Sequence, residues 1–234
     1  MTASYFDQFT IVSLVPGVTN SSLMLVLSVV FIFGFFNPSK LIPNRWQSII
    51  EVLYDHWVTL VKDSLGIRGS KYFPFVFSLF ILIAWLNVLG LFPYVFTVGT
   101  HIVVTFGLSL SILMVVTILG LKNFRANFFS MLMPQGAPMG LAPLLVLIET
   151  ASYLSRALSL GIRLAANLSA GHLLFAILAS FAYQMIVGDL LLLSVFPVAI
   201  MIFITVLEIA VAMIQAYVFC LLTTIYLGDT INLH

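Results

Sequence analysis

The chain has 234 residues, of which 62% are hydrophobic and 7% are charged, and its formal net charge is +1. A soluble fold of this length could not hide so much apolar surface from water, so the composition indicates an integral membrane protein. The small net charge argues against nucleic acid as a partner, and the single cysteine, Cys220, excludes an internal disulfide and a cysteine-based metal site.

The amino-terminal segment predicts one transmembrane helix. Residues 1–17 lack a basic start and a clear cleavage site, so we expect no signal or transit peptide here. Residues 21–36 carry no charge and, with flanking residues, reach about the 20 residues that a bilayer core requires. We therefore predict the first membrane span at 21–36.

Residues 43–66 predict an amphipathic helix. Their apolar side chains recur at three- and four-residue intervals, and charged residues fall on the opposite side. Asn44 and Gln47 have the spacing of a capping box at the start, and Gly66 is typical of a helix end. We expect this helix to lie along the membrane surface.

Two further spans follow. Residues 72–121 carry no charge and are interrupted only by the sequence FTVGTH, so they predict transmembrane helices at 73–96 and 101–120. Seven of the nine basic residues lie in the flanking segments 37–72 and 121–139. The positive-inside rule therefore places those two segments on the cytoplasmic or matrix side.

The carboxy-terminal part predicts a hairpin of two long helices, 140–186 and 189–227. An upright helix of about 46 residues would reach roughly 69 Å, whereas the hydrocarbon core is about 30 Å thick. The first helix must either break near Gly161 or Gly171 or lie strongly tilted. A break would leave backbone groups unsatisfied in lipid, so we favour the tilted helix. The predicted fold class is an all-α integral membrane protein with a single membrane domain, residues 1–234.

Polar residues form a stripe along the first long helix. Glu149, Arg156 and Arg163 are spaced by sevens, and Ser152, Ser159 and Asn167 lie on the same face. An arginine near the middle of a bilayer costs about 2.5 to 3.5 kcal/mol on insertion scales, so it requires a counter-charge or a function. One interpretation is purely structural, with salt bridges from Glu149 to Arg156 and from Arg163 to Glu208.

The second long helix carries a matching set of polar residues, Glu208, Gln215 and Asp229. If the two helices are antiparallel, one cluster contains His172, Asn167, Glu208 and Gln215, and a second cluster contains Glu149 and Asp229. Arg163 then lies between the two clusters. Histidine titrates near neutral pH and can pass a proton to a carboxylate, whereas arginine stays charged, so Arg163 must attract or block protons.

Bland alternatives stay open for several of these residues. In the alternative interpretation, His172 is a hydrogen-bonded histidine of the protein core, and Gln215 forms a hydrogen bond within its own helix. Three isolated polar residues have no companions in the pattern and are predicted to be structural: His56, Asn87 and His101.

The sequence RLAANLSAGH, followed by VLEIAVAMIQAYVFCLLTTIYLGD, resembles the subunit a family of F-type ATP synthases, with His and Glu in the order of the mitochondrial members. The resemblance implies that Arg163 is the essential arginine facing a rotating ring of c subunits, with Arg156 and Ser159 in support. It assigns His172, Glu208, Asn167 and Gln215 to an outer half-channel and Glu149 and Asp229 to an inner one. The implied function is a stator proton channel that carries H⁺ to and from a ring carboxylate.

The resemblance also implies a setting. The partners would be the c-ring, peripheral stalk subunit b, other F0 subunits and membrane lipid, and no cofactor or metal is expected. The chain would be a non-catalytic part of the ATP synthase, because it has no Gly-rich phosphate loop. Its expected location is the mitochondrial inner membrane, with the amino terminus on the intermembrane side and the carboxy terminus in the matrix.

Two other functions compete with this one. A secondary transporter also buries charge at the midplane, but such proteins usually show repeated halves, and the sequence shows no internal repeat. A structural subunit of a respiratory membrane complex would tolerate loss of Arg163 with a modest defect in assembly.

Overall fold

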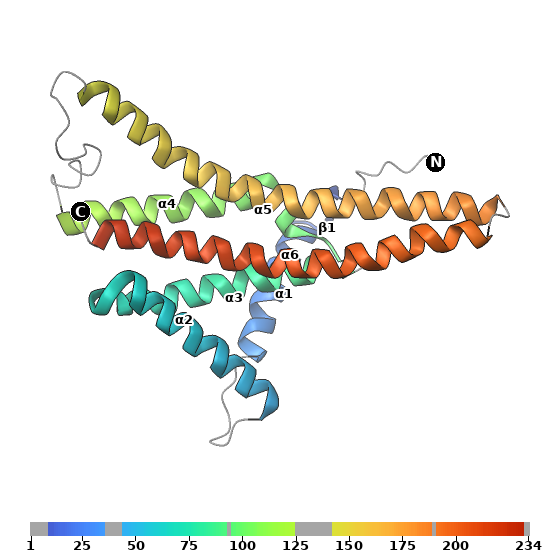
Figure 1. Ribbon diagram of the computed structural model, residues 1–234, viewed down its shortest axis with the longest axis horizontal. Helices are drawn as coiled ribbons and strands as arrows, with labels where there is room; N and C mark the ends of the chain where they lie inside the picture. Colours follow the sequence, from blue (N-terminus) through green and yellow to red (C-terminus); the bar gives the residue numbers. More distant parts are fainter. Residues whose placement is uncertain (1–8, 36–43, 93–94, 125–141, 189–190, 232–234) are drawn as a thin grey trace. The chain divides into compact units, whose positions relative to one another are not determined.

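The computed structural model describes residues 9–35, 44–92, 95–124, 142–188 and 191–231 (Figure 1). The helices of this part of the chain are α1 (Asn20–Phe35), α2 (Arg45–Gly69), α3 (Phe73–Gly90), α4 (Ile102–Phe124), α5 (Ala142–Val187) and α6 (Leu191–Ile231). Two 3-10 helices, η2 (Ser70–Tyr72) and η3 (Val98–Thr100), and two short strands, β1 (Ser13–Val15) and β2 (Val18–Thr19), accompany them. Some ends of the predicted helices lie outside the described residues: 36, 43, 93–94, 140–141 and 189–190.

Four of the described helical segments are long and apolar enough to cross a membrane. They are Ser70–Gly90, Ile102–Phe124, Pro143–Val187 and Leu192–Ile231. Helix formation satisfies every internal backbone group within the segment, which is what a lipid environment demands. The predicted fold class, an all-α integral membrane protein, is confirmed.

Helix α1 begins at a reciprocal cap. The backbone N–H of Ser22 donates to Thr19 Oγ1 at 3.3 Å, and the N–H of Thr19 donates to Ser22 Oγ at 3.0 Å. Before it, Gly17 adopts φ 90° and turns the chain between the antiparallel strands β1 and β2. The 16 residues of α1 reach only about 24 Å, which is less than the hydrocarbon core of about 30 Å.

Helix α2 is amphipathic, as its sequence pattern predicts. Asn44 Oδ1 accepts from the backbone N–H of Arg45 at 2.9 Å and caps the helix start. The buried face packs on α3, where the rings of Trp57 and Phe80 lie 4.8 Å apart. At Gly66, the predicted end of this helix, the backbone leaves the helical region (φ 67°, ψ −171°) before helical turns resume as far as Gly69. The position of α2 along a membrane surface stays a prediction.

Helix α5 is helical over all its 46 residues, including Gly161 and Gly171. The interpretation with a break near one of these glycines is therefore wrong. A helix of about 46 residues is roughly twice as long as the hydrocarbon core is thick, so strong tilt remains the prediction for α5. Helix α6 continues beyond the predicted end at residue 227 to Ile231, so Asp229 belongs to the helix.

The chain divides into two compact units, and each long helix contributes to both. Unit 1 consists of Met1–Phe35, Leu82–Thr105 and Ile162–Tyr217, and unit 2 of Phe36–Ile81, Phe106–Gly161 and Val218–His234. In unit 1, α1 meets α3 through a stacked pair, Phe31 and Trp85, with ring centroids 4.7 Å apart. In unit 2, the buried side chains include Trp57, Val61, Val76, Val116, Phe219 and Leu227.

Candidate functional site

In unit 1, α5 and α6 pair through polar side chains. Asn167 Nδ2 donates a hydrogen bond to Gln215 Oε1 at 3.2 Å. The sequence-based prediction places these two residues in one cluster, and the structure brings them into direct contact. Gln215 is 6% exposed whereas Asn167 is exposed, so the bond joins a buried side chain to the surface of α5.

Glu208 lies directly against the backbone of α5 at Gly171. A Cβ atom added at Gly171 would clash with Glu208 Oε1 and would stand 2.7 Å from Glu208 Cδ. Glycine therefore provides the space that the carboxylate occupies, one residue before His172. This contact explains why the sequence has no side chain at position 171.

If protons pass through this cluster, as the family resemblance implies, Gly171→Ala should displace the Glu208 carboxylate and slow proton entry about tenfold, which corresponds to about 1.4 kcal/mol. The measurement is proton flux into vesicles that contain the assembled complex. Gly107→Ala is the matched control, because an added Cβ there meets nothing within 4 Å. Equal flux in the two variants would contradict the role given to this contact.

Three polar atoms of this cluster are buried without a hydrogen-bond partner among the described residues: His172 Nε2, Glu208 Oε1 and Gln215 Nε2. An unsatisfied buried polar group costs about 1 to 3 kcal/mol, so three of them together are unusual in a purely structural core. The imidazole of His172 also interacts with the backbone of Gly90 at the end of α3. At most one of the two ring nitrogens of His172 is therefore hydrogen-bonded within the described residues, whereas a purely structural core histidine would use both.

A small cavity adjoins two of these residues, Glu208 and Gln215. It leaves about 20 Å³ for the centre of a water molecule, and a single water needs roughly 10 to 15 Å³ by this measure. Its polar lining consists of Asn87, Asn167, Glu208 and Gln215. The size and polar lining of the cavity suit one water molecule that is hydrogen-bonded to these side chains.

Asn87 belongs to this cluster although the sequence analysis treated it as structural. Its side chain is 1% exposed, and its Nδ2 donates to the backbone carbonyl of Ala212 in α6 at 3.1 Å. Asn87 is the single carboxamide in the apolar sequence of α3. A lone amide in a membrane span is itself a signal, because a polar group there needs a partner.

Arg163 lies on an exposed side of α5, one helical turn before Asn167 of the cluster. Its neighbours Leu160 and Leu164 are buried, whereas Arg163 and Ile162 are exposed on the surface of unit 1. The guanidinium group therefore belongs to an outward-facing apolar surface. A membrane-embedded charge on such a surface is expected to meet a partner there.

The inner cluster lies in unit 2. Arg156 Nη2 and Glu149 Oε1 are 3.8 Å apart, and their side chains are 40% and 42% exposed. The predicted salt bridge between them is confirmed, although at this exposure it contributes about 1 kcal/mol or less. Ser159 is exposed one turn further along α5, and Asp229 is half-buried in the last turn of α6.

Tyr153 is a member of the inner cluster that the sequence analysis did not identify. Its hydroxyl is buried without a hydrogen bond in the described part of the chain, and it interacts electrostatically with Asp229, Arg156 and Tyr226. It lies four residues after Glu149 on the same helix. That spacing within the polar stripe was the available signal.

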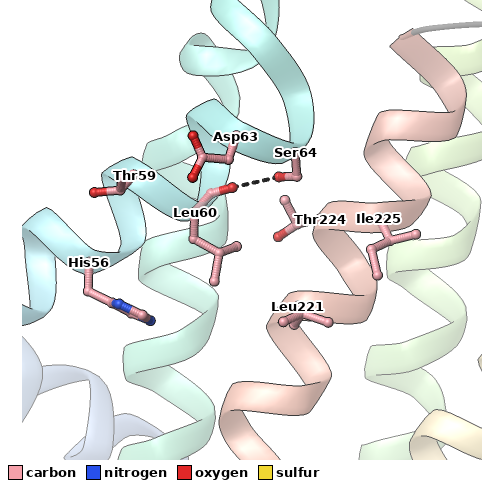
Figure 2. A pocket seen from close by; sticks show the side chains of 8 residues that line it. All are labelled: His56, Thr59, Leu60, Asp63, Ser64, Leu221, Thr224 and Ile225. Atoms are coloured by element: carbon pink, nitrogen blue, oxygen red, sulfur yellow. Dashed lines mark hydrogen bonds between the residues drawn. The ribbon is translucent and has the colours of Figure 1, made fainter.

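A wider cleft in unit 2 contains none of the predicted site residues. It has a volume of about 570 Å³ and is lined by α2 and α6 residues, namely His56, Thr59, Leu60, Asp63, Ser64, Leu221, Thr224 and Ile225 (Figure 2). The hydroxyl of Ser64 donates to the Leu60 carbonyl at 2.8 Å, and that of Thr224 donates to the Cys220 carbonyl at 2.7 Å. These hydroxyls are thus satisfied within their own helices, unlike the atoms around Glu208.

The described residues include no group of three or more His, Cys, Asp or Glu side chains that could hold a metal ion. The two polar clusters consist of carboxylates, an imidazole, amides and a phenol, all of which can form hydrogen bonds.

Known proteins of similar sequence identify the family of this chain. The family model described as ATP synthase A chain matches residues 18–228. The chain is 62% identical over 234 residues to ATP synthase subunit a of Metridium senile, with 100% of both chains covered. It is 42% identical over 252 residues to ATP synthase subunit a of Marchantia polymorpha, again with 100% of both covered, and 44% identical over 221 residues to that of Rhodospirillum rubrum, with 92% of this chain and 90% of the relative covered. The chain therefore belongs to the ATP synthase A chain family.

Proposed function

We propose that this chain is the stator proton channel of an F-type ATP synthase, in which two half-channels carry H⁺ to and from a carboxylate on a rotating c-ring. Its partners are the c-ring, peripheral stalk subunit b, other F0 subunits and membrane lipid. The chain is not catalytic by itself. We place it in the mitochondrial inner membrane, with the amino terminus on the intermembrane side and the carboxy terminus in the matrix.

The outer half-channel runs through the unit 1 cluster. A proton that reaches His172 passes towards Glu208, and the amides of Asn167 and Gln215 orient the water between the carriers. The unsatisfied buried atoms of this cluster carry the proposal, together with a water-sized cavity lined by two of their residues, Glu208 and Gln215. A structural core would leave such groups hydrogen-bonded, because each unmade bond destabilises the fold.

The inner half-channel runs through the unit 2 cluster. Glu149 and Asp229 are the carboxylates that receive protons leaving the ring. The Glu149 side chain is 42% exposed, so its carboxylate is accessible to molecules outside this chain. Arg156 lies 3.8 Å from Glu149 and holds this carboxylate in place on the same face of α5.

Arg163 separates the two paths. A guanidinium group stays charged at any accessible pH, so it cannot carry a proton across. As a ring carboxylate passes within about 4 to 6 Å, the fixed positive charge favours its ionised form and drives off its proton. Each unit charge that crosses the membrane supplies about 2.3 kcal/mol per 100 mV, so a direct leak past Arg163 would waste this energy.

The experiment that tests the function begins with gentle purification of the complex that contains this chain. We expect it to co-purify with a small two-helix proteolipid that carries a mid-membrane carboxylate. In vesicles under an imposed potential, its membrane sector should conduct protons. A secondary transporter would lack the proteolipid, and a structural subunit would leave proton flux unchanged when Arg163 is replaced.

A further inference from the structure

A short segment before α1 is held in place by hydrogen bonds to one residue, Asn20. We define the N-terminal arm as residues Phe9–Val12. Asn20, the first residue of α1, donates from Nδ2 to the Thr10 carbonyl at 3.3 Å and accepts at Oδ1 from the N–H of Val12 at 3.3 Å. Its own backbone N–H donates to the Val12 carbonyl at 3.1 Å. Three hydrogen bonds to a single residue thus fasten the arm to the helix start.

The arm brings an aromatic ring to His172. The Phe9 and His172 rings meet edge to face, with centroids 6.5 Å apart and an interplanar angle of 83°. This geometry lies within the favourable range for aromatic pairs, about 4.5 to 7 Å. The imidazole also interacts with the backbone of Gly90. Gly171, the residue before His172, packs against the Glu208 carboxylate.

The half-buried His172 thus has neighbours from two other parts of unit 1, the N-terminal arm and the end of α3. Its Nε2 is buried and bonds to no described residue, so any proton that it exchanges must come from a molecule outside this set. An aromatic ring excludes water from the surface it covers and also restricts the rotation of its neighbour. The position of Phe9 therefore bears directly on how water reaches the imidazole.

We propose that the N-terminal arm is a cover over His172, in which Phe9 positions the imidazole and limits its access to water while Asn20 holds the arm closed. The arm has no role in proton transfer itself. Its consequence for proton entry rests on the proposed function, but the cover is a property of the fold that can be measured separately.

The test is the rate at which diethyl pyrocarbonate modifies each histidine in membranes that contain the complete complex, resolved by mass spectrometry. Phe9→Ala and Asn20→Ala should raise the rate at His172 roughly three- to tenfold, the range expected from loss of one aromatic pair or its anchor. Phe9→Tyr keeps the ring and should restore the original rate. His56 is an exposed internal reference and should not change.

The matched control is Phe33→Ala, which removes an aromatic ring that is 77% exposed on α1. An unchanged rate at His172 in Phe9→Ala would overturn the proposal, and so would an equal rise at His56, because general loosening would then be the cause. Proton flux in the same membranes separates this inference from the proposed function. If Phe9→Ala raises the reactivity of His172 but leaves the proton flux unchanged, the arm is a cover that does not affect proton entry. If Glu208→Gln leaves the flux unchanged, the proposed proton channel is contradicted.

Discussion

Arg163→Lys leaves the complex assembled but should reduce proton-driven ATP synthesis at least roughly 100-fold, a change of about 2.7 kcal/mol in the effective barrier. Lysine keeps a positive charge, but it lacks the planar guanidinium and it loses its proton more readily when desolvated. A group that can release its proton no longer separates the two half-channels. Arg163→Ala should fail in the same way, because the fixed charge is then absent altogether.

Arg156→Lys is the matched control on the same helix. Arg156 lies in a half-exposed salt bridge with Glu149, which lysine can also form, so the loss should be much smaller. Assembly is checked by native electrophoresis, and synthesis by ATP production in vesicles under an imposed potential. A lysine variant at position 163 that is both active and coupled would contradict the separation mechanism.

Glu208→Gln should reduce proton flux from the outer side at least about tenfold, which corresponds to roughly 1.4 kcal/mol or more. The amide has nearly the same shape as the carboxyl group, so packing against Gly171 is preserved while proton exchange is lost. Replacement of both His172 and Glu208 by alanine should slow entry further, because both carriers are then removed. The measurement is dye-monitored flux through the membrane sector.

The control for this variant is Glu51→Gln, which neutralises an exposed carboxylate on α2 and should leave the flux unchanged. The loss in Glu208→Gln should also depend on the side from which protons are supplied, since Glu208 belongs to the outer path. Normal flux in Glu208→Gln would exclude this residue as a proton carrier.

The wide cleft of unit 2 and the small cavity of unit 1 differ in the polar groups that line them. The Ser64 and Thr224 hydroxyls at the cleft of about 570 Å³ are satisfied, whereas the cavity of about 20 Å³ is lined by Glu208 and Gln215, which each carry an unsatisfied buried atom. Proton transfer requires chains of small polar groups and single waters, so the narrow site suits it better.

The sequence by itself determined the class of protein and the main polar residues. Composition alone indicated a membrane protein, and the seven-residue spacing of Glu149, Arg156 and Arg163 placed them on one face of a helix. The register of two antiparallel helices joined by a short turn also placed Asn167 and Gln215 in one cluster, although their direct hydrogen bond is seen only in the structure. These features are periodic and local, so they follow from helix geometry.

Only the tertiary structure decided the contacts of isolated residues. Asn87 and Ala212 are 125 positions apart, and no periodic pattern links the Phe9 ring to His172. Likewise, nothing in the local sequence shows that Glu208 occupies the space left by Gly171. Such contacts arise when separate helices pack, and they depend on distances between elements that no local pattern encodes.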